Sequence, residues 1–188
     1  QYTSQPEYWA ETDRIVGDAP STLRLSLPEV YLEDADVASH IERIHKTMQQ
    51  YVQDGTLRTL PAGAVLTERW SGGSAPRRGI VLTVDLEADE YTPGSASLIR
   101  PTEKTVVERI PPRLKVREGA CLELPHIMIL IDDPDRRSIE PLVEKTDSFS
   151  KLYDTDLMQN GGHITGWFIP QGKDTDAIES GLEALCDR

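Results

Sequence analysis

The sequence has little of the chemistry that marks secreted, membrane-spanning or nucleic-acid-binding chains. Its 188 residues include two cysteines, Cys121 and Cys186, which lie far apart outside any CxxC pair, so we expect reduced thiols rather than a disulfide framework. The longest apolar run, residues 127–131, is far shorter than the ~20 residues of a membrane span. A net charge of −12 lacks the excess of lysine and arginine that nonspecific binding to nucleic acid or anionic lipid requires. We therefore expect a soluble cytoplasmic protein with no membrane partner, and nucleic acid is a disfavoured partner.

Standard catalytic and nucleotide-binding signatures are also missing. No GxGxxG, GxxxxGK[ST], GxSxG or HExxH motif occurs in the chain. The three aspartates of residues 132–135 surround Pro134, a pattern typical of a solvated turn rather than of a cation site. His126 and His163 are expected at the starts of buried strands, and zinc would need partner ligands that the sequence does not display. The sequence therefore predicts no dedicated metal site.

What is present suits a globular protein with a core. Hydrophobic residues make up 38% of the chain and charged residues 28%. The length suits one generous domain or two small lobes, and we expect a single domain over residues 1–188. Residues 1–21 are polar and show no clear period, so we expect an arm or loop there.

The clearest element is an amphipathic helix. Apolar residues recur in it at spacings of mostly three and four, at Val37, Ile41, Ile44, Met48, Tyr51 and Val52. Asp34 or Asp36 can cap its start, and Gly55 can close its end. We interpret His40 and His45 as ordinary polar-face residues of this helix.

Alternating and short apolar runs predict strands, expected over residues 22–27, 64–70, 79–86, 126–131 and 163–169. Gly72 and Gly73 favour a hairpin between the second and third of these runs. Residues 126–131 (HIMILI) suit a central buried strand, because the run is short, continuous and branched. A short helix over 137–145 and a final helix over 174–185 complete the chain. The expected fold is α/β of the mixed α+β type, with a mixed or antiparallel sheet flanked by amphipathic helices.

A basic segment stands apart in this acidic chain. Residues 100–117 (RPTEKTVVERIPPRLKVR) hold six cations and two anions, a local net charge of +4. Pairing with acidic loops at 87–90 or 132–135 is one interpretation, although surface pairs stabilise by only about 0–1 kcal/mol each. The other is a site for a phosphate or carboxylate, which arginine binds through two parallel hydrogen bonds. Both interpretations stay open.

Glu103 lies among these cations, which would keep its carboxylate ionised. It could act as a general base or hold Mg²⁺ through water, or it could form a structural ion pair with Arg113 or Lys104. We expect Thr102 or Thr105 to cap a short helix that Pro111 and Pro112 end.

Several segments of the chain, taken in order, carry a family resemblance. They are APSTLRLSLPE at 19–29, YVQDGTL at 51–57, RRGIVLTVDL at 77–86, LPHIMILIDDP at 124–134 and GGHITGWFI at 161–169. Between the third and fourth lies E-x-T at residues 103–105, with Arg113 ten residues after Glu103. This order and spacing resembles the DUF1015 family of unknown function over most of residues 19–188.

The resemblance implies a longer protein and a nucleotide-linked activity. The family's Asp-Gly-His-His-Arg signature would follow Arg188, so the chain is expected to be the N-terminal half of a longer protein. That signature is similar to the Gly-x-x-Arg phosphate-binding corner of ParB-like domains, and one ParB-like relative is a free-serine kinase. The resemblance therefore implies a small-molecule phosphotransferase using ATP or ADP with Mg²⁺. The alternative is a non-catalytic regulatory or structural binding module with a ParB-like nucleotide switch.

For the phosphotransferase, we expect Arg100, Lys104 and Arg113 to hold phosphate oxygens. Thr105 would donate a hydrogen bond, and Glu103 would be the catalytic base or a Mg²⁺ ligand. The expected partner is a small molecule or a nucleotide, and a homo-oligomer stays open. A half-domain whose chemistry lies wholly beyond Arg188 also stays open.

Overall fold

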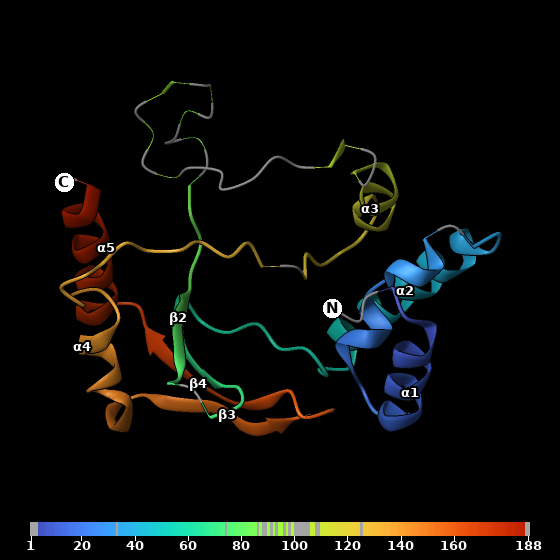
Figure 1. Ribbon diagram of the computed structural model, residues 1–188, viewed down its shortest axis with the longest axis horizontal. Helices are drawn as coiled ribbons and strands as arrows, with labels where there is room; N and C mark the ends of the chain where they lie inside the picture. The colour runs from blue at the N-terminus through green and yellow to red at the C-terminus, as the bar shows by residue number, and fades with distance from the viewer. Residues whose placement is uncertain are drawn as a thin grey trace. The chain divides into compact units, whose positions relative to one another are not determined.

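The computed structural model describes residues 4–186 apart from 33, 74, 86, 88–89, 91, 93, 96, 98, 100–105, 108–109 and 125, and without the side chains of Pro112 and Cys186. The chain forms two compact units, each built from two separate stretches. Unit 1 comprises residues 1–59 and 102–128, and unit 2 comprises residues 60–101 and 129–188. Helices and one antiparallel sheet are both present, so the expected mixed α+β class is confirmed (Figure 1). The single domain expected over 1–188 stays a prediction.

Unit 1 is helical in its described part. Its elements are α1 (Pro6–Val16), the 3-10 turns η1 (Thr22–Leu25) and η2 (Glu29–Tyr31), α2 (Val37–Gln53) and α3 (Ile110–Arg117). Residues 1–21, expected as an arm or loop, thus contain α1, which begins at Pro6, since proline fits the first turn of a helix. The Arg24 guanidinium contacts the Asp13 carboxylate and donates to the Gly17 carbonyl at 2.6 Å. These contacts fasten the end of α1 to η1.

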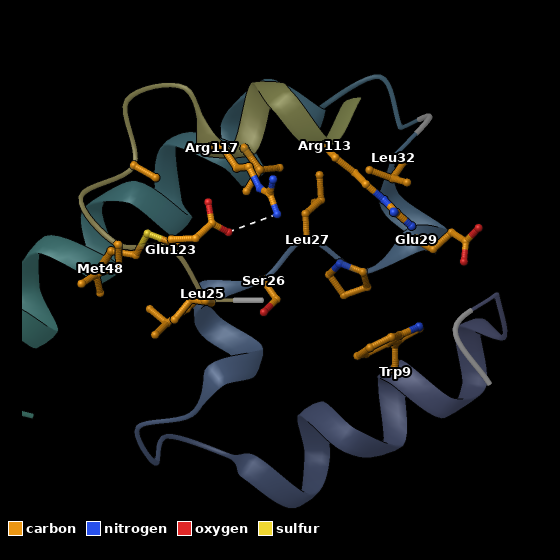
Figure 2. Close-up of a pocket in the computed structure, with 15 residues that line it drawn as sticks. Trp9, Leu25, Ser26, Leu27, Glu29, Leu32, Met48, Arg113, Arg117 and Glu123 are labelled. Atoms are coloured by element: carbon orange, nitrogen blue, oxygen red, sulfur yellow. Dashed lines mark ion pairs between the residues drawn. The ribbon is translucent and has the colours of Figure 1, made fainter. Parts of the chain in front are cut away.

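Helix α2 confirms the apolar stripe predicted from the sequence. Ile44, Met48 and Tyr51 are buried in it and form the core of unit 1 together with Leu25 of η1. The Tyr51 hydroxyl accepts a hydrogen bond from the Ser21 amide at 3.2 Å, which fixes the start of η1 over the helix. Leu25 and Met48 also border the cavity shown in Figure 2.

The strand predicted over residues 22–27 is wrong, because Thr22–Leu25 forms a 3-10 turn instead. Local side-chain hydrogen bonds satisfy the backbone there. The Ser21 hydroxyl accepts from the Leu23 amide at 3.2 Å, and the Ser26 hydroxyl donates to the Thr22 carbonyl at 2.9 Å. The alternation of apolar residues over six positions does not distinguish a strand from a single turn that buries Leu25. A strand would also need a partner strand beside it.

The two prolines of this segment lie in the first turn of a helix. Pro111 and Pro112 follow Ile110 at the start of α3, and the earlier helix expected before them falls mostly on residues outside the described ones, so it stays a prediction. Proline suits the first turn because its missing N–H would have no helical acceptor there. The helix therefore runs through Arg113 and Arg117, on the carboxyl side of the prolines.

Unit 2 is a four-stranded antiparallel sheet with helices against one face. The strands are β1 (Gly63–Trp70), β2 (Arg77–Val81), β3 (Ser150–Leu157) and β4 (Gly162–Pro170), in the spatial order β2-β1-β4-β3. The predicted β1–β2 hairpin and the strand expected over 163–169 are confirmed. The strand expected over 79–86 is shorter than predicted, because β2 ends at Val81 and residues 82–85 are not part of a strand. Strand β3 was not predicted, although it lies at one edge of the sheet.

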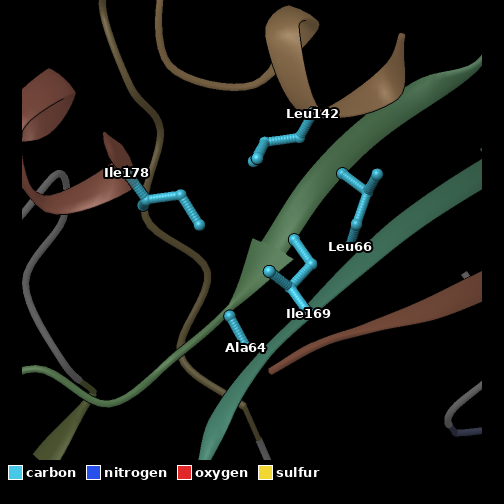
Figure 3. Close-up of a cluster of buried hydrophobic side chains, with 5 residues drawn as sticks. All are labelled: Ala64, Leu66, Leu142, Ile169 and Ile178. Carbon is cyan, nitrogen blue, oxygen red and sulfur yellow. The ribbon is translucent and has the colours of Figure 1, made fainter. Parts of the chain in front are cut away.

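The core of unit 2 lies between this sheet and the C-terminal helices. Ala64, Leu66 and Ile169 project from β1 and β4 toward Leu142 and Ile178 (Figure 3). Leu142 belongs to α4 (Glu140–Val143), followed by the turn η5 (Thr146–Ser148), and Ile178 belongs to α5 (Lys173–Cys186). The two helices expected near the C-terminus are therefore confirmed, and both cover the same sheet face.

The central strand predicted over residues 126–131 is wrong. This run is irregular coil, and its side chains are solvent-exposed, at 84% for Ile127 and 77% for Leu130. His126 is exposed in the same coil rather than starting a buried strand. A five-residue apolar run cannot by itself specify a partner strand, and this run pairs with neither edge strand of the sheet, β2 or β3. In the part of the chain that the structure describes, no helix is long and apolar enough to cross a membrane.

A pair of truncations tests this assignment of core and surface. Ile169→Ala removes a fully buried side chain and should lower the free energy of unfolding by about 2–5 kcal/mol. Ile127→Ala removes a mostly exposed one and should change it by less than about 0.5 kcal/mol. Urea denaturation of both variants measures the difference. A large loss for Ile127→Ala would restore the buried-strand interpretation.

Candidate functional site

A cavity of about 470 Å³ lies in unit 1, within the range typical of small-molecule sites. Figure 2 shows Arg113 and Arg117 reaching from α3 and Trp9 standing on α1 at the other side of the cavity. Most of the wall is apolar, and its apolar members are Trp9, Leu25, Leu27, Pro28, Leu32, Met48, Val116, Ala120, Leu122 and Leu124. The cavity therefore offers an apolar interior, with Arg113 and Arg117 on the α3 side and the carboxylates of Glu29 in η2 and Glu123 after α3 in the same lining.

Helix α3 is held against α2 by one specific hydrogen bond. His45 Nε2 donates to the Val116 carbonyl at 2.8 Å, because a carbonyl oxygen can only accept. The chain then turns at Gly119, whose φ of +84° is a conformation that favours glycine. Beyond this turn, Ala120 packs with Val116 against the unit 1 core. His45, expected as an ordinary polar-face residue, thus positions one wall of the cavity.

Two arginines of α3 line the cavity and differ in their partners. Arg117 pairs with Glu123 at 3.2 Å, and both side chains are more than half exposed. Such a pair stabilises by about 0–1 kcal/mol, so a ligand anion could displace Glu123 at small cost. Arg113 makes no hydrogen bond or ion pair with any residue in the described part of the chain. The two lie four residues apart, on the same face of the helix.

Only part of the predicted site can be placed. Arg113 lies at the cavity, as an anion site would require. Arg100, Glu103, Lys104 and Thr105 lie outside the described residues, so their roles stay predictions. Within the basic segment, Arg117 is a wall residue that was not singled out from the sequence. The sequence did contain a signal for Arg117, because a residue four positions after Arg113 lies on the same face of a helix.

Unit 2 carries a second cluster of charged side chains, on the same sheet face as its core. His163 of β4 contacts Asp154 of β3 through Nε2 and Asp156 through Nδ1, each at 2.7 Å. Lys151 donates to Asp154 at 2.6 Å, and the ring of Trp70 meets His163 edge-on at 6.1 Å between centroids. The alternation of Asp154 and Asp156 along one strand was a sequence signal for this cluster.

The surroundings of the histidine in this cluster favour its protonated form. Both ring nitrogens face carboxylates, first Asp156 and then Asp154, and these hydrogen bonds raise the pKa of His163. The pKa of Asp154 is lowered, mainly by Lys151 and then by His163. Because the carboxylates lie at opposite nitrogens, one ion could not bind all three groups. Among the described residues, no group of three acidic, histidine or cysteine side chains could hold a metal ion.

Glu68 and Arg78 extend the polar row across the sheet. Glu68 of β1 is nearly buried and accepts from Arg78 Nε of β2 at 2.8 Å. Thr165, opposite Glu68 on β4, is also buried. The charges of this face are paired with one another, so we interpret the row as a structural network that joins neighbouring strands.

The chain belongs to the DUF1015 family of proteins of unknown function, whose family model matches residues 1–186. The resemblance seen in the sequence is therefore confirmed. No curated protein and no solved structure matches the chain.

The raised pKa of His163 predicts a specific dependence of stability on pH. Because its pKa is raised, its contribution is full below the unfolded value of about 6.5 and disappears as the pH rises through the folded value. Asp154 stays ionised in this range, since its pKa is lowered. The melting temperature of His163→Gln should lie furthest below wild type near pH 6 and approach it near pH 9, roughly. A gap that is constant between these pH values would contradict the assignment.

Proposed function

We propose that unit 1 binds a small amphipathic anion, a molecule with an apolar body and a carboxylate or phosphate at one end. The observation that carries this proposal is the apolar cavity with Arg113 beside it, a guanidinium that has no partner among the described residues. Ligand sites are commonly apolar clefts with a few polar groups that orient the ligand. Here the orienting groups are the arginines of α3.

The apolar body would contribute through burial. Each methylene moved from water into the cavity is worth about 0.8 kcal/mol, so affinity should rise with the size of the body until the cavity is filled. Trp9 offers a flat ring on the α1 side, which suits an aromatic or planar group. The anchoring of α1 by Arg24 keeps this ring beside the cavity.

The anionic end would be held by Arg113, with Arg117 as a second donor. A guanidinium binds a carboxylate or phosphate through two parallel hydrogen bonds. Arg117 would exchange Glu123 for the ligand, keeping its charge paired in both states. The net charge of the chain is −12, so a local positive site is also needed to overcome the general repulsion of anions.

A nucleotide is the specific form of this ligand that the sequence predicts. Its base would occupy the cavity beside Trp9, and its phosphates would meet Arg113. The phosphotransferase hypothesis adds Glu103 as catalytic base or Mg²⁺ ligand and Lys104 as a phosphate ligand. A non-catalytic nucleotide switch would use the same binding site without the step at Glu103.

A ligand series separates the two parts of the proposed site. Hexyl phosphate should raise the melting temperature more than inorganic phosphate, which lacks the body, or hexanol, which lacks the charge. Arg113→Ala should weaken hexyl phosphate binding about tenfold to a hundredfold, since hydrogen bonds to charged groups contribute about 1.5–3 kcal/mol. Calorimetric titration measures the constants.

Arg58→Ala is the matched control, because Arg58 is an exposed arginine of unit 1 that does not line the cavity. This variant should bind hexyl phosphate as wild type does. Equal weakening by Arg113→Ala and Arg58→Ala would show that the overall charge of the chain, and not the cavity, accounts for the effect. Absence of hexyl phosphate binding to the wild-type protein would reject the proposal.

The catalytic form of the hypothesis has its own test. ADP formation from ATP·Mg²⁺, with and without serine, should occur in the wild-type protein and fall by at least about a hundredfold in Glu103→Gln. Nucleotide binding without turnover in the wild type would favour the switch. Turnover that survives the substitution would remove Glu103 from the mechanism.

A further inference from the structure

The two edges of the unit 2 sheet differ in how they are protected from pairing with another strand. Edge strand β3 presents Lys151, Asp154 and Asp156, and its register shifts between Lys151 and Tyr153. Charged side chains and bulges are the usual devices that keep an edge strand from joining another chain. Edge strand β2 (RRGIV) has a regular register, and its apolar end carries no such device. In the described part of the chain no further strand pairs with β2, so we interpret its edge as the one open to strand addition.

The charge at the start of β2 is unbalanced. Arg77 lies directly opposite Arg69 of β1, and like charges at such positions are destabilising. Arg77 makes no ion pair or hydrogen bond through its side chain within the described residues. Its neighbour Arg78, in contrast, is paired with Glu68. An acidic partner for Arg77 would have to come from outside this ladder.

The strand-like sequence continues past the end of β2. Leu82 and Val84 follow Val81 and are each 38% exposed. Strand β1 begins at Gly63, and Val65 is opposite Val81, so only Ala64 and Gly63 remain beyond this pair and Val84 has no residue of β1 opposite it. Asp85 comes next and makes no ion pair among the residues that the structure describes.

We propose that β2 pairs antiparallel with β2 of a second copy of this chain, about a two-fold axis at Val81. Residues 82–85 then continue the strand in each copy. In this register Arg77 lies opposite Asp85 of the second copy, and Asp85 lies opposite Arg77 of that copy. Segment 77–85 is therefore complementary in charge to a second, antiparallel copy of itself, because its basic start meets the acidic end of that copy.

The same register also matches the apolar residues. Ile80 lies opposite Leu66 and packs against the unit 2 core, so Leu82 and Val84 fall on that face when the strand continues. Ile80 of one copy then meets Leu82 of the other. The pairing would join two four-stranded sheets into one continuous sheet and cover side chains that are otherwise exposed. It requires no ligand and is independent of the proposed function.

A charge exchange tests this interface. Sedimentation equilibrium of the 188-residue chain should show a concentration-dependent dimer, and Arg77→Glu or Asp85→Arg alone should weaken it at least about tenfold. The double variant Arg77→Glu, Asp85→Arg restores opposite charges across the axis and should recover the dimer. Circular dichroism and melting temperature verify that every variant is folded.

The control is Lys151→Glu on the opposite edge, which should leave the dimer unchanged. A strictly monomeric wild-type chain would overturn the proposal. So would a dimer that neither single variant weakens, or one that the double variant fails to restore.

Discussion

The cavity of unit 1 depends on the contact between two stretches of chain that are distant in sequence. The hydrogen bond from His45 to the Val116 carbonyl spans 71 residues and holds α3 on α2. The residues after α3 complete the wall, and Val116 and Ala120 pack on the core that Met48 shares with η1. Without this contact the arginines of α3 would have no fixed position. The site is therefore a product of tertiary packing, and no continuous motif encodes it.

The two charged regions of the molecule differ in what their charges already bind. In unit 2, His163 pairs with both Asp154 and Asp156, and Glu68 pairs with Arg78, so the network stabilises strands and leaves little for a ligand. In unit 1, a guanidinium stands beside an apolar cavity with no partner among the described residues, and its neighbour has only a weak, exposed pair. This contrast is the reason for assigning binding to unit 1 and stability to the row in unit 2.

Periodicity in the sequence predicted the elements whose burial is regular, including α2, the β1–β2 hairpin, β4 and α5. It failed where partners decide the structure. Residues 22–27 alternate but close a turn over α2, and residues 126–131 are apolar but have no strand beside them. The prolines before Arg113 lie in the first turn of α3, which the sequence did not predict because proline occurs both after helix ends and in first turns. The basic segment did predict Arg113, but Trp9 was missed because its approach to the cavity depends on how α1 folds back.

The central claim is that an amphipathic anion occupies the cavity between α1, α3 and the turns η1 and η2. Hydrogen–deuterium exchange with and without saturating hexyl phosphate tests it most directly, because exchange locates the residues that a ligand stabilises. The account predicts slower exchange in residues 25–32 and 113–124 and unchanged exchange in β3 and β4. Unchanged exchange throughout, or protection confined to the unit 2 sheet, would contradict it.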